Sequence, residues 1–279
     1  MFSSVLLTVD FDRTLTAPDS TIPQRNIEAI LDFTAQGGVF TVNTGRSIPM
    51  IAPYADQIPV NAPLLLYNGS AAYDWGKKEF TFTKAIDLPL WETLQALVAE
   101  FPDLTVELQG VKAHYTFSEN KPWEAYCAHN GCVYDYAKPG DDVGPFLKIA
   151  LYGTFHDNTV AGMYAGSPAE MARMDDVERL LNEKYGAYCE VFRACPRIID
   201  IHAKGVSKAN IARYLQKELG KTRLVCVGDG ENDVPMLEDA DFSYCPADAI
   251  VKDRYENVCP CGDGAIADVI YEKIPGLLK

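Results

Sequence analysis

The chain has 279 residues, of which 48% are hydrophobic and 23% charged, and its formal net charge is −14. This length suits one large domain or two smaller ones, and the composition is ordinary for a globular protein. The negative charge argues against broad binding to nucleic acid or to an anionic membrane surface, although a bound cation can still attract a small anion to one cleft. The sequence shows no basic segment followed by a long apolar one and no apolar run that would cross a bilayer. We therefore expect a cytoplasmic protein, and the sequence does not indicate an oligomeric state.

The first part of the chain alternates between strand and helix patterns. Short apolar runs at 5–9, 39–42 and 62–67 predict strands. Apolar residues at helical spacing predict a helix within 23–38, and a shorter helix is predicted within 48–58. This alternation favours an α/β fold, a doubly wound parallel sheet of the Rossmann-like kind. In such a sheet, the polar residues that follow the strands meet at one edge.

The middle of the chain has a different pattern of predicted strands and helices. Longer strand patterns are interleaved there with two helical patterns, at 88–101 and 168–186. We expect an inserted α+β domain over 84–194, within a core domain formed by 1–83 and 195–279. The strand and helix alternation resumes after the insertion and includes a predicted helix for which Ser207 is a plausible N-cap.

Cysteine usage does not indicate a disulfide framework. The eight cysteines have no paired metal-binding pattern, and we interpret them as reduced thiols. The sequence CPCG at 259–262 resembles half of a zinc site but has no second pair nearby. These cysteines are Cys127, Cys132, Cys189, Cys195, Cys226, Cys245, Cys259 and Cys261.

Four polar groups follow predicted strands or precede a predicted helix. They are Asp10 with Asp12, the run Thr44, Gly45 and Arg46, the pair Lys204 and Lys208, and the run GDGEND at 228–233. Each has an ordinary structural interpretation when it is taken alone, as a helix cap, a turn or a solvated side chain. The last run also resembles a calcium loop but lacks the remaining ligand positions.

Taken together, the four groups predict one site for phosphate chemistry. Asp10 and Asp229, with Asp233, offer the hard oxygen ligands that Mg²⁺ prefers, and the ion would compensate the crowding of Asp10 and Asp12. A threonine hydroxyl and a lysine can hold phosphate oxygens. One carboxylate can then attack phosphorus while another transfers protons. Either Lys204 or Lys208 could be the lysine that holds the phosphate.

The motifs DFDRTLT, NTGR, KGVSK and GDGENDVPML, in this order, resemble those of the haloacid dehalogenase superfamily of phosphatases. The long insertion between the second and third motifs is similar to that of the Cof-type, sugar-phosphatase-like branch with a large cap domain. The segment YNGSAAYD at 67–74 also resembles a segment of that branch. The resemblance covers the core domain, whereas the inserted domain matches only in size and texture.

The resemblance implies a role for each matching residue. Asp10 would be the nucleophile and a metal ligand, and Asp12 the general acid and base, with its backbone carbonyl on the metal. Thr44 would bind the transferred phosphoryl group, Lys208 would neutralise it, and Asp229 would complete the metal ligands.

Further residues have supporting roles by the same resemblance. Asp233 would act on the metal directly or through water, and Asn232 would contact the substrate or its phosphate. Gly45, Arg46 and Asn68 are weaker candidates for substrate contact, and Lys204 competes with Lys208. The implied activity is Mg²⁺-dependent hydrolysis of a small phosphorylated metabolite, such as a sugar phosphate, through an aspartyl-phosphate.

One residue departs from the family pattern. Arg13 stands where the family usually has glycine after the second aspartate, so the turn must accept a side chain. The carboxylate of Asp12 favours hydrolysis over a stable phosphoenzyme. A phosphomutase that uses the same intermediate is the alternative, and a non-catalytic binding protein on this scaffold is a third hypothesis.

Overall fold

The structure is a computed structural model that describes residues 1–159 and 161–278. By their contacts, these residues form two compact units. The first contains 1–45, 54–82 and 207–278, and the second contains 46–53 and 83–206. The second unit thus extends past the expected border at residue 195 to residue 206. Residues 195–206 belong to the second unit, because the strand that they contain pairs with the strand just before it.

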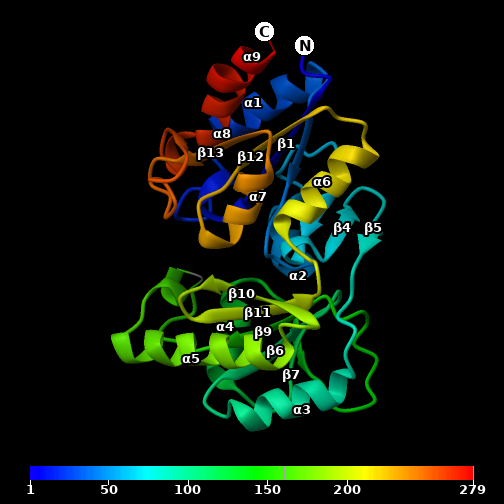
Figure 1. The fold of residues 1–279 in the computed structure, drawn as a ribbon, viewed down its shortest axis with the longest axis vertical. Coiled ribbons are helices and arrows are strands. Elements are labelled where there is room, and N and C mark those ends of the chain that lie inside the picture. Colours follow the sequence, from blue (N-terminus) through cyan, green and yellow to red (C-terminus); the bar gives the residue numbers. More distant parts are fainter. Residues whose placement is uncertain (160, 279) are drawn as a thin grey trace. The chain divides into compact units, whose positions relative to one another are not determined.

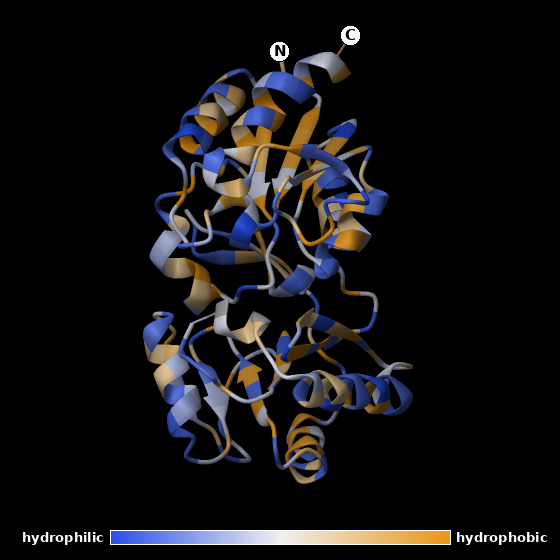
Figure 2. Ribbon diagram, turned by 90° about the vertical axis from the view of Figure 1, so that its left-hand side faces the viewer, coloured by the Kyte–Doolittle hydropathy of each residue, from blue (hydrophilic) through white to orange (hydrophobic). Residues whose placement is uncertain are grey.

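The first unit is built on a parallel sheet with the strand order β14–β13–β12–β1–β2 (Figure 1). Its strands are β1 (Val5–Val9), β2 (Val39–Val42), β12 (Arg223–Val227), β13 (Phe242–Pro246) and β14 (Glu256–Val258). Every residue of β1 is buried, as expected for a strand with a parallel neighbour on each side. Figure 2 shows the strands of this sheet as largely hydrophobic.

Helices pack on both faces of this sheet, which confirms the predicted doubly wound fold. The helices of the unit are α1 (Gln24–Ala35), α6 (Lys208–Glu218), α7 (Val234–Asp239), α8 (Ala265–Asp268) and α9 (Ile274–Leu277). One apolar cluster joins Ile211 of α6 and Leu237 of α7 to Leu6 of β1. Because strand side chains alternate, Leu7 faces the opposite side, where α1 and α8 pack together.

A small antiparallel sheet follows in the chain, with the order β3–β4–β5. It contains β3 (Leu64–Leu66), β4 (Ala71–Asp74) and β5 (Glu79–Thr83). The strand β3 was expected in the parallel sheet, and a parallel bridge between Asn43 and Leu65 places it beside the end of β2. The strands β4 and β5 were not predicted from the sequence.

The second unit is α+β, with a sheet in the order β10–β11–β9–β6–β7–β8. Its strands are β6 (Thr105–Gln109), β7 (His114–Thr116), β8 (Tyr134–Tyr136), β9 (Lys148–Tyr152), β10 (Cys189–Cys195) and β11 (Ile198–Ala203). Its helices are α3 (Leu90–Glu100), α4 (Lys121–His129) and α5 (Pro168–Tyr185), and α2 (Ile48–Ala55) begins in this unit. The helix α4 was not predicted, although Asn120 caps it by accepting a hydrogen bond from the Trp123 amide. Within the described part of the chain, no helix is long and apolar enough to span a membrane.

Candidate active site

The carboxylates of Asp10, Asp229 and Asp233 lie together at the carboxyl ends of β1 and β12. Val9 and Val227 are register partners, and the Asp10 amide donates to the Val227 carbonyl at 2.9 Å. One oxygen from each of the three carboxylates lies within 4.8 Å of the others, and all three residues are buried. Parallel pairing thus joins residues that stand more than two hundred positions apart in the sequence.

The turn after β12 holds Asp233 in place. Oδ2 of Asp233 accepts hydrogen bonds from the amides of Asp229 and Gly230, both at 3.0 Å. A Cβ atom at Gly228 would lie 2.6 Å from the Cβ of Asp233. Glycine is therefore required at 228 for the turn to close on the aspartate.

Lys208 is the cation of this cluster. Its ammonium donates to Oδ1 of Asp10 and to Oδ1 of Asp233, each at 2.6 Å, and its side chain is 1% exposed. Lys208 is the first residue of α6, and Ser207 caps that helix as expected. Lys204 belongs to the second unit, where its exposed ammonium donates to the Gly186 carbonyl at 2.8 Å.

Residues after β2 and β3 pack against the same helix start. The Asn68 amide donates to the Thr44 carbonyl at 3.0 Å. A Cβ atom at Gly45 would lie 2.8 Å from Oδ1 of Asn68, so the two segments touch closely. Asn232 reaches the same Oδ1 through a long hydrogen bond of 3.5 Å. The structure therefore brings these four predicted residues into one neighbourhood.

The segment Phe11–Leu15 forms a tight turn directly after Asp10. Asp12 is partly exposed there, in contrast to the buried Asp10. Arg13 has a φ of 57°, a left-handed conformation that costs a side-chain-bearing residue on the order of 1 kcal/mol. Its Nε lies 3.8 Å from Oδ2 of Asp229, and the hydroxyl of Thr14 donates to Oδ1 of Asp229 at 3.3 Å.

Thr14 and Asn43 were not among the predicted site residues. The Asn43 side chain donates to the Lys208 carbonyl at 2.8 Å and so fixes the start of α6 against the end of β2. Both residues lie inside motifs that were recognised, Thr14 in DFDRTLT and Asn43 in NTGR. Those motifs were the available signal, but the partners of these two residues lie far away in the sequence.

The cluster carries more negative charge than one lysine neutralises. Burial raises the pKa of Asp10 to about 7, with contributions from Asp233 and Asp12 and an opposing one from Lys208. Burial likewise raises the pKa of Asp229 well above its usual value, reinforced by Asp10 and Asp233. For Lys208, burial lowers the pKa, but its two carboxylate partners outweigh burial and raise it. A divalent cation would relieve this excess charge, and the donor set fits Mg²⁺, which prefers carboxylate oxygens.

Arg46 belongs to the second unit, in a segment held by a buried hydrogen-bond network. The hydroxyl of Ser47 lies 2.7 Å from Nε2 of His114, and Nδ1 of His114 lies 3.4 Å from Oε1 of Glu107. The Glu107 carboxylate also accepts from Trp123 at 2.5 Å and from Gln109 at 2.7 Å. Burial raises the pKa of Glu107, but these partners, His114 foremost, outweigh burial and lower it. We interpret this network as structural.

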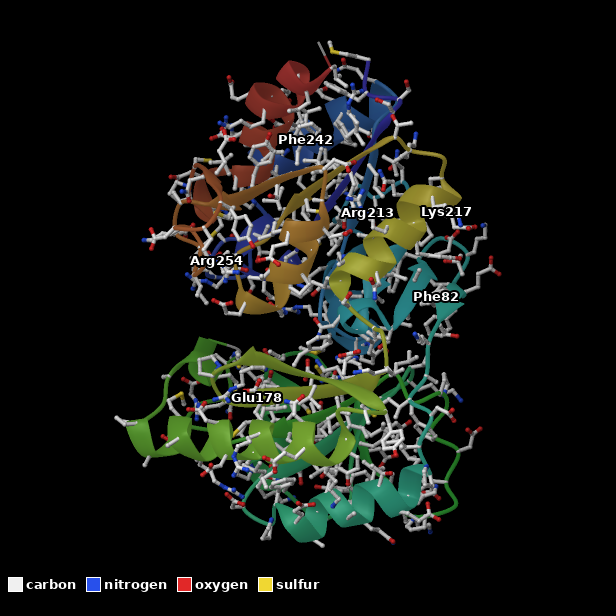
Figure 3. All side chains as sticks on the ribbon, viewed as in Figure 1. Phe82, Glu178, Arg213, Lys217, Phe242 and Arg254 are labelled. Atoms are coloured by element: carbon white, nitrogen blue, oxygen red, sulfur yellow. The ribbon has the colours of Figure 1, made fainter. Side chains whose placement is uncertain are left out.

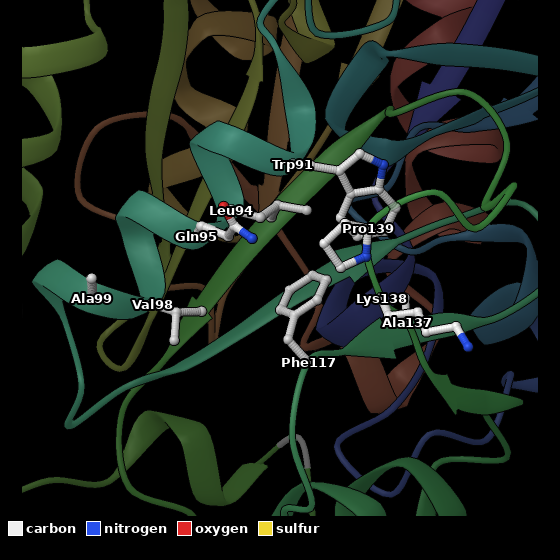
Figure 4. A pocket seen from close by; sticks show the side chains of 9 residues that line it. All are labelled: Trp91, Leu94, Gln95, Val98, Ala99, Phe117, Ala137, Lys138 and Pro139. Carbon is white, nitrogen blue, oxygen red and sulfur yellow. The ribbon is translucent and has the colours of Figure 1, made fainter.

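The second unit also has an apolar cavity of about 340 Å³ (Figure 4). Its lining residues are Trp91, Leu94, Gln95, Val98, Ala99, Phe117, Ala137, Lys138 and Pro139. None of these residues has a carboxylate, thiol or imidazole, and the amine of Lys138 is the one titratable side-chain group among them. The eight cysteines are free thiols, as expected.

An α/β sheet that gathers three carboxylates and a buried lysine at the carboxyl ends of its strands has the framework of an enzyme. A family model of haloacid dehalogenase-like hydrolases matches residues 7–270. The chain belongs to this family, and the predictions of family, fold and a phosphatase-type hydrolase are confirmed at that level.

Curated relatives match over most of the chain at low identity. A 5-amino-6-(5-phospho-D-ribitylamino)uracil phosphatase of Bacillus subtilis is 22% identical over 91% of this chain and 88% of its own length. A pyridoxal phosphate phosphatase of Escherichia coli is 23% identical over 96% of this chain and 98% of its own length. Among solved structures, a haloacid dehalogenase-like hydrolase from Bacteroides thetaiotaomicron superposes with a TM-score of 0.78 at 22% identity. That alignment covers 95% of this chain and 97% of the other and shows a shared fold.

Proposed function

We propose that the protein is a Mg²⁺-dependent phosphatase that hydrolyses a small phosphorylated metabolite through a phosphorylated Asp10. The observation that carries the proposal is the buried Lys208 ammonium, hydrogen-bonded at 2.6 Å to both Asp10 and Asp233. A cation held there counters the charge of the nucleophile and that of an arriving phosphoryl group.

Asp10, Asp229 and Asp233 are the proposed metal ligands, together with the backbone carbonyl of Asp12. The raised pKa values of Asp10 and Asp229 support this assignment, because burial and then the neighbouring carboxylates disfavour the charged form, which a bound cation would favour. When bound, Mg²⁺ would supply the positive charge that lets an anionic substrate approach an anionic nucleophile.

In the first half of the proposed reaction, a carboxylate oxygen of Asp10 forms a bond to phosphorus. The bond from phosphorus to the ester oxygen breaks, and the carboxyl group of Asp12 gives that oxygen a proton. The Thr44 hydroxyl and the Lys208 ammonium donate hydrogen bonds to the phosphoryl oxygens.

In the second half, Asp12 accepts a proton from water, and the water oxygen attacks phosphorus. The bond from phosphorus to Asp10 breaks, inorganic phosphate leaves, and Asp10 is restored as a carboxylate. The contrast between the buried Asp10 and the partly exposed Asp12 supports this division, because proton exchange requires access to water.

The substrate class is proposed from the relatives and from the size of the inserted domain. Two relatives are named as phosphatases of 5-amino-6-(5-phospho-D-ribitylamino)uracil and of pyridoxal phosphate, both small phosphorylated molecules. We propose that the inserted domain determines substrate specificity and that Gly45, Asn68 and Asn232 contact the substrate. Arg46 and Lys204 stay as predicted substrate contacts.

The test is the release of inorganic phosphate from these two compounds and a panel of sugar phosphates, with and without Mg²⁺. Asp10→Asn should lower the rate about a thousandfold or more, because the amide cannot serve as the nucleophile. Asp19→Asn, in an exposed loop, is the matched control and should keep full activity. Substantial activity in Asp10→Asn would refute the mechanism, and an isomeric product without free phosphate would indicate a mutase instead.

A further inference from the structure

Arg13 occupies a backbone position that favours glycine. Its φ of 57° lies in the left-handed region, where a side chain adds strain. The hydroxyl of Thr16 stabilises this conformation by accepting from the Arg13 amide at 3.2 Å. An arginine at this position therefore carries backbone strain that a glycine would avoid, and this suggests that its guanidinium has a role.

The guanidinium lies beside the carboxylate that Lys208 does not hydrogen-bond. The ammonium of Lys208 is engaged by Asp10 and Asp233, whereas Nε of Arg13 lies 3.8 Å from Oδ2 of Asp229. The other oxygen of Asp229 accepts from the Thr14 hydroxyl. Lys208 thus pairs with Asp10 and Asp233, and Arg13 pairs with Asp229.

The two cations differ in their freedom to move. The Lys208 side chain is 1% exposed and fixed by two short hydrogen bonds, whereas the Arg13 side chain is 40% exposed. An exposed arginine can swing its head into solvent at little cost. Arg13 can therefore leave Asp229 when another cation takes its place.

We propose that Arg13 is a positioning residue that pairs with Asp229 in the metal-free protein and competes with the divalent ion for that carboxylate. This role rests on the proposed function, because it takes Asp229 as a metal ligand. Arg13 would stabilise the metal-free state and repel the bound ion, and both effects weaken metal binding. For like charges a few ångströms apart near the surface, we expect a weakening of about tenfold.

The test measures metal binding directly, by titration calorimetry of the full-length protein with Mg²⁺ and with Mn²⁺. Arg13→Gln removes the charge and keeps a side chain in the left-handed turn, whereas Arg13→Gly also relieves the backbone strain. Both should bind each ion about tenfold more tightly than the wild type. Arg13→Lys keeps the charge and should return the affinity towards that of the wild type.

The matched control is Arg254→Gln. Arg254, labelled in Figure 3, is 44% exposed and pairs with Glu231 in the same turn as Asp229, but it contacts Glu231 and Glu238 rather than a proposed ligand. Arg254→Gln should change the metal affinity much less than Arg13→Gln does. A second readout is the melting temperature, which Arg13→Gln should lower in EDTA but not in saturating Mg²⁺, where it should equal or exceed that of the wild type.

If Arg13→Gln binds the metal no more tightly than the wild type, Arg13 does not compete with the ion for Asp229. This holds even if phosphate release follows the proposed function. A wild-type protein that binds neither ion would overturn the metal assignment and the role of Arg13 with it. Failure to hydrolyse any tested compound, with metal binding as expected here, would count against the proposed function alone.

Discussion

At the scale of single residues, the arrangement of Asp10, Lys208 and Asp233 is the most constrained part of the site. A buried ammonium between two carboxylates balances part of their charge, and removing it leaves those charges without compensation. Lys204, the other predicted candidate, is an exposed residue of the second unit, which explains how two nearby lysines can differ in importance.

The first prediction is that Lys208→Met abolishes phosphatase activity and lowers the free energy of unfolding by about 3–5 kcal/mol, because a buried ion pair loses one partner. Urea denaturation and phosphate release measure the two effects. Lys204→Met is the control and should change stability by less than about 0.5 kcal/mol. Equal effects of the two variants would contradict the assignment of Lys208.

The second prediction concerns pH in the metal-free protein. Burial raises the pKa of Asp10 from 3.8 to about 7, so the folded protein binds more protons than the unfolded chain between these values. The contribution of Asp10 to stability in EDTA should therefore fall as the pH rises from about 4 to about 7, on the order of 2–4 kcal/mol in total.

Urea midpoints in EDTA across this pH window measure the effect. The difference between the wild type and Asp10→Asn isolates the contribution of Asp10, and Mg²⁺ should restore the stability of the wild type at the upper end. A pH dependence in Asp10→Asn that equals that of the wild type would contradict the raised pKa of Asp10.

At the scale of elements, the turn after β12 depends on one glycine. A Cβ atom at Gly228 would overlap the Asp233 side chain, which the turn amides hold in place. The third prediction is that Gly228→Ala lowers the unfolding free energy by about 1–3 kcal/mol and reduces phosphate release, because Asp233 must shift.

Gly276→Ala is the control for this prediction, because a Cβ atom there meets open space and the residue lies in α9. It should leave stability unchanged or slightly increase it. Chemical denaturation compares the two variants. A stable, fully active Gly228→Ala would show that the turn can close without glycine.

The elements also show where sequence patterns succeed. The apolar runs at 5–9 and 39–42 predicted β1 and β2, because a strand buried on both faces shows its character locally. The strands β4 and β5 and the helix α4 were missed. The strand β5 has five residues, none of them fully buried, and α4 has nine residues, so each pattern is short.

Some residues of the site could likewise be predicted from the sequence, and others could not. Carboxylates after strands predicted the positions of Asp10 and Asp229, because parallel pairing aligns the strand ends. Thr14 and Asn43 could not be assigned, since their partners Asp229 and Lys208 are identified only when distant segments meet. The assigned catalytic and metal-binding roles of these residues stay predictions.

At the scale of the whole molecule, each unit has its own apolar core. One cluster, which includes Leu6, Ile211 and Leu237, lies in the first unit, and another, which includes Leu108, Val177 and Ile199, lies in the second. The segment 46–53 contacts the second unit although both its neighbours along the chain belong to the first. Sequence patterns could not predict this exchange, because it depends on contacts such as that of Ser47 with His114.

The fourth prediction is that the two units respond separately to perturbation. Glu107→Leu leaves several buried donors without an acceptor and should destabilise the second unit by about 3 kcal/mol or more. Mg²⁺ should instead raise the thermal transition of the first unit. Calorimetry should thus resolve two transitions, with Glu183→Gln, an exposed surface change, as the control. A single transition that moves equally under both changes would contradict this independence.

The central place of β1 has a consequence for how the protein is made. Its partner β2 ends at Val42, but its other partner β12 begins only at Arg223. At about 5–20 residues per second, a ribosome needs roughly 10–40 s to synthesise the chain between them. During that interval the backbone groups along one edge of β1 have no partner strand. For most of it, Asp10 also lacks the ammonium of Lys208. A nascent chain in this state can pair with the wrong strand, so we expect its yield to depend on chaperones that shield such edges.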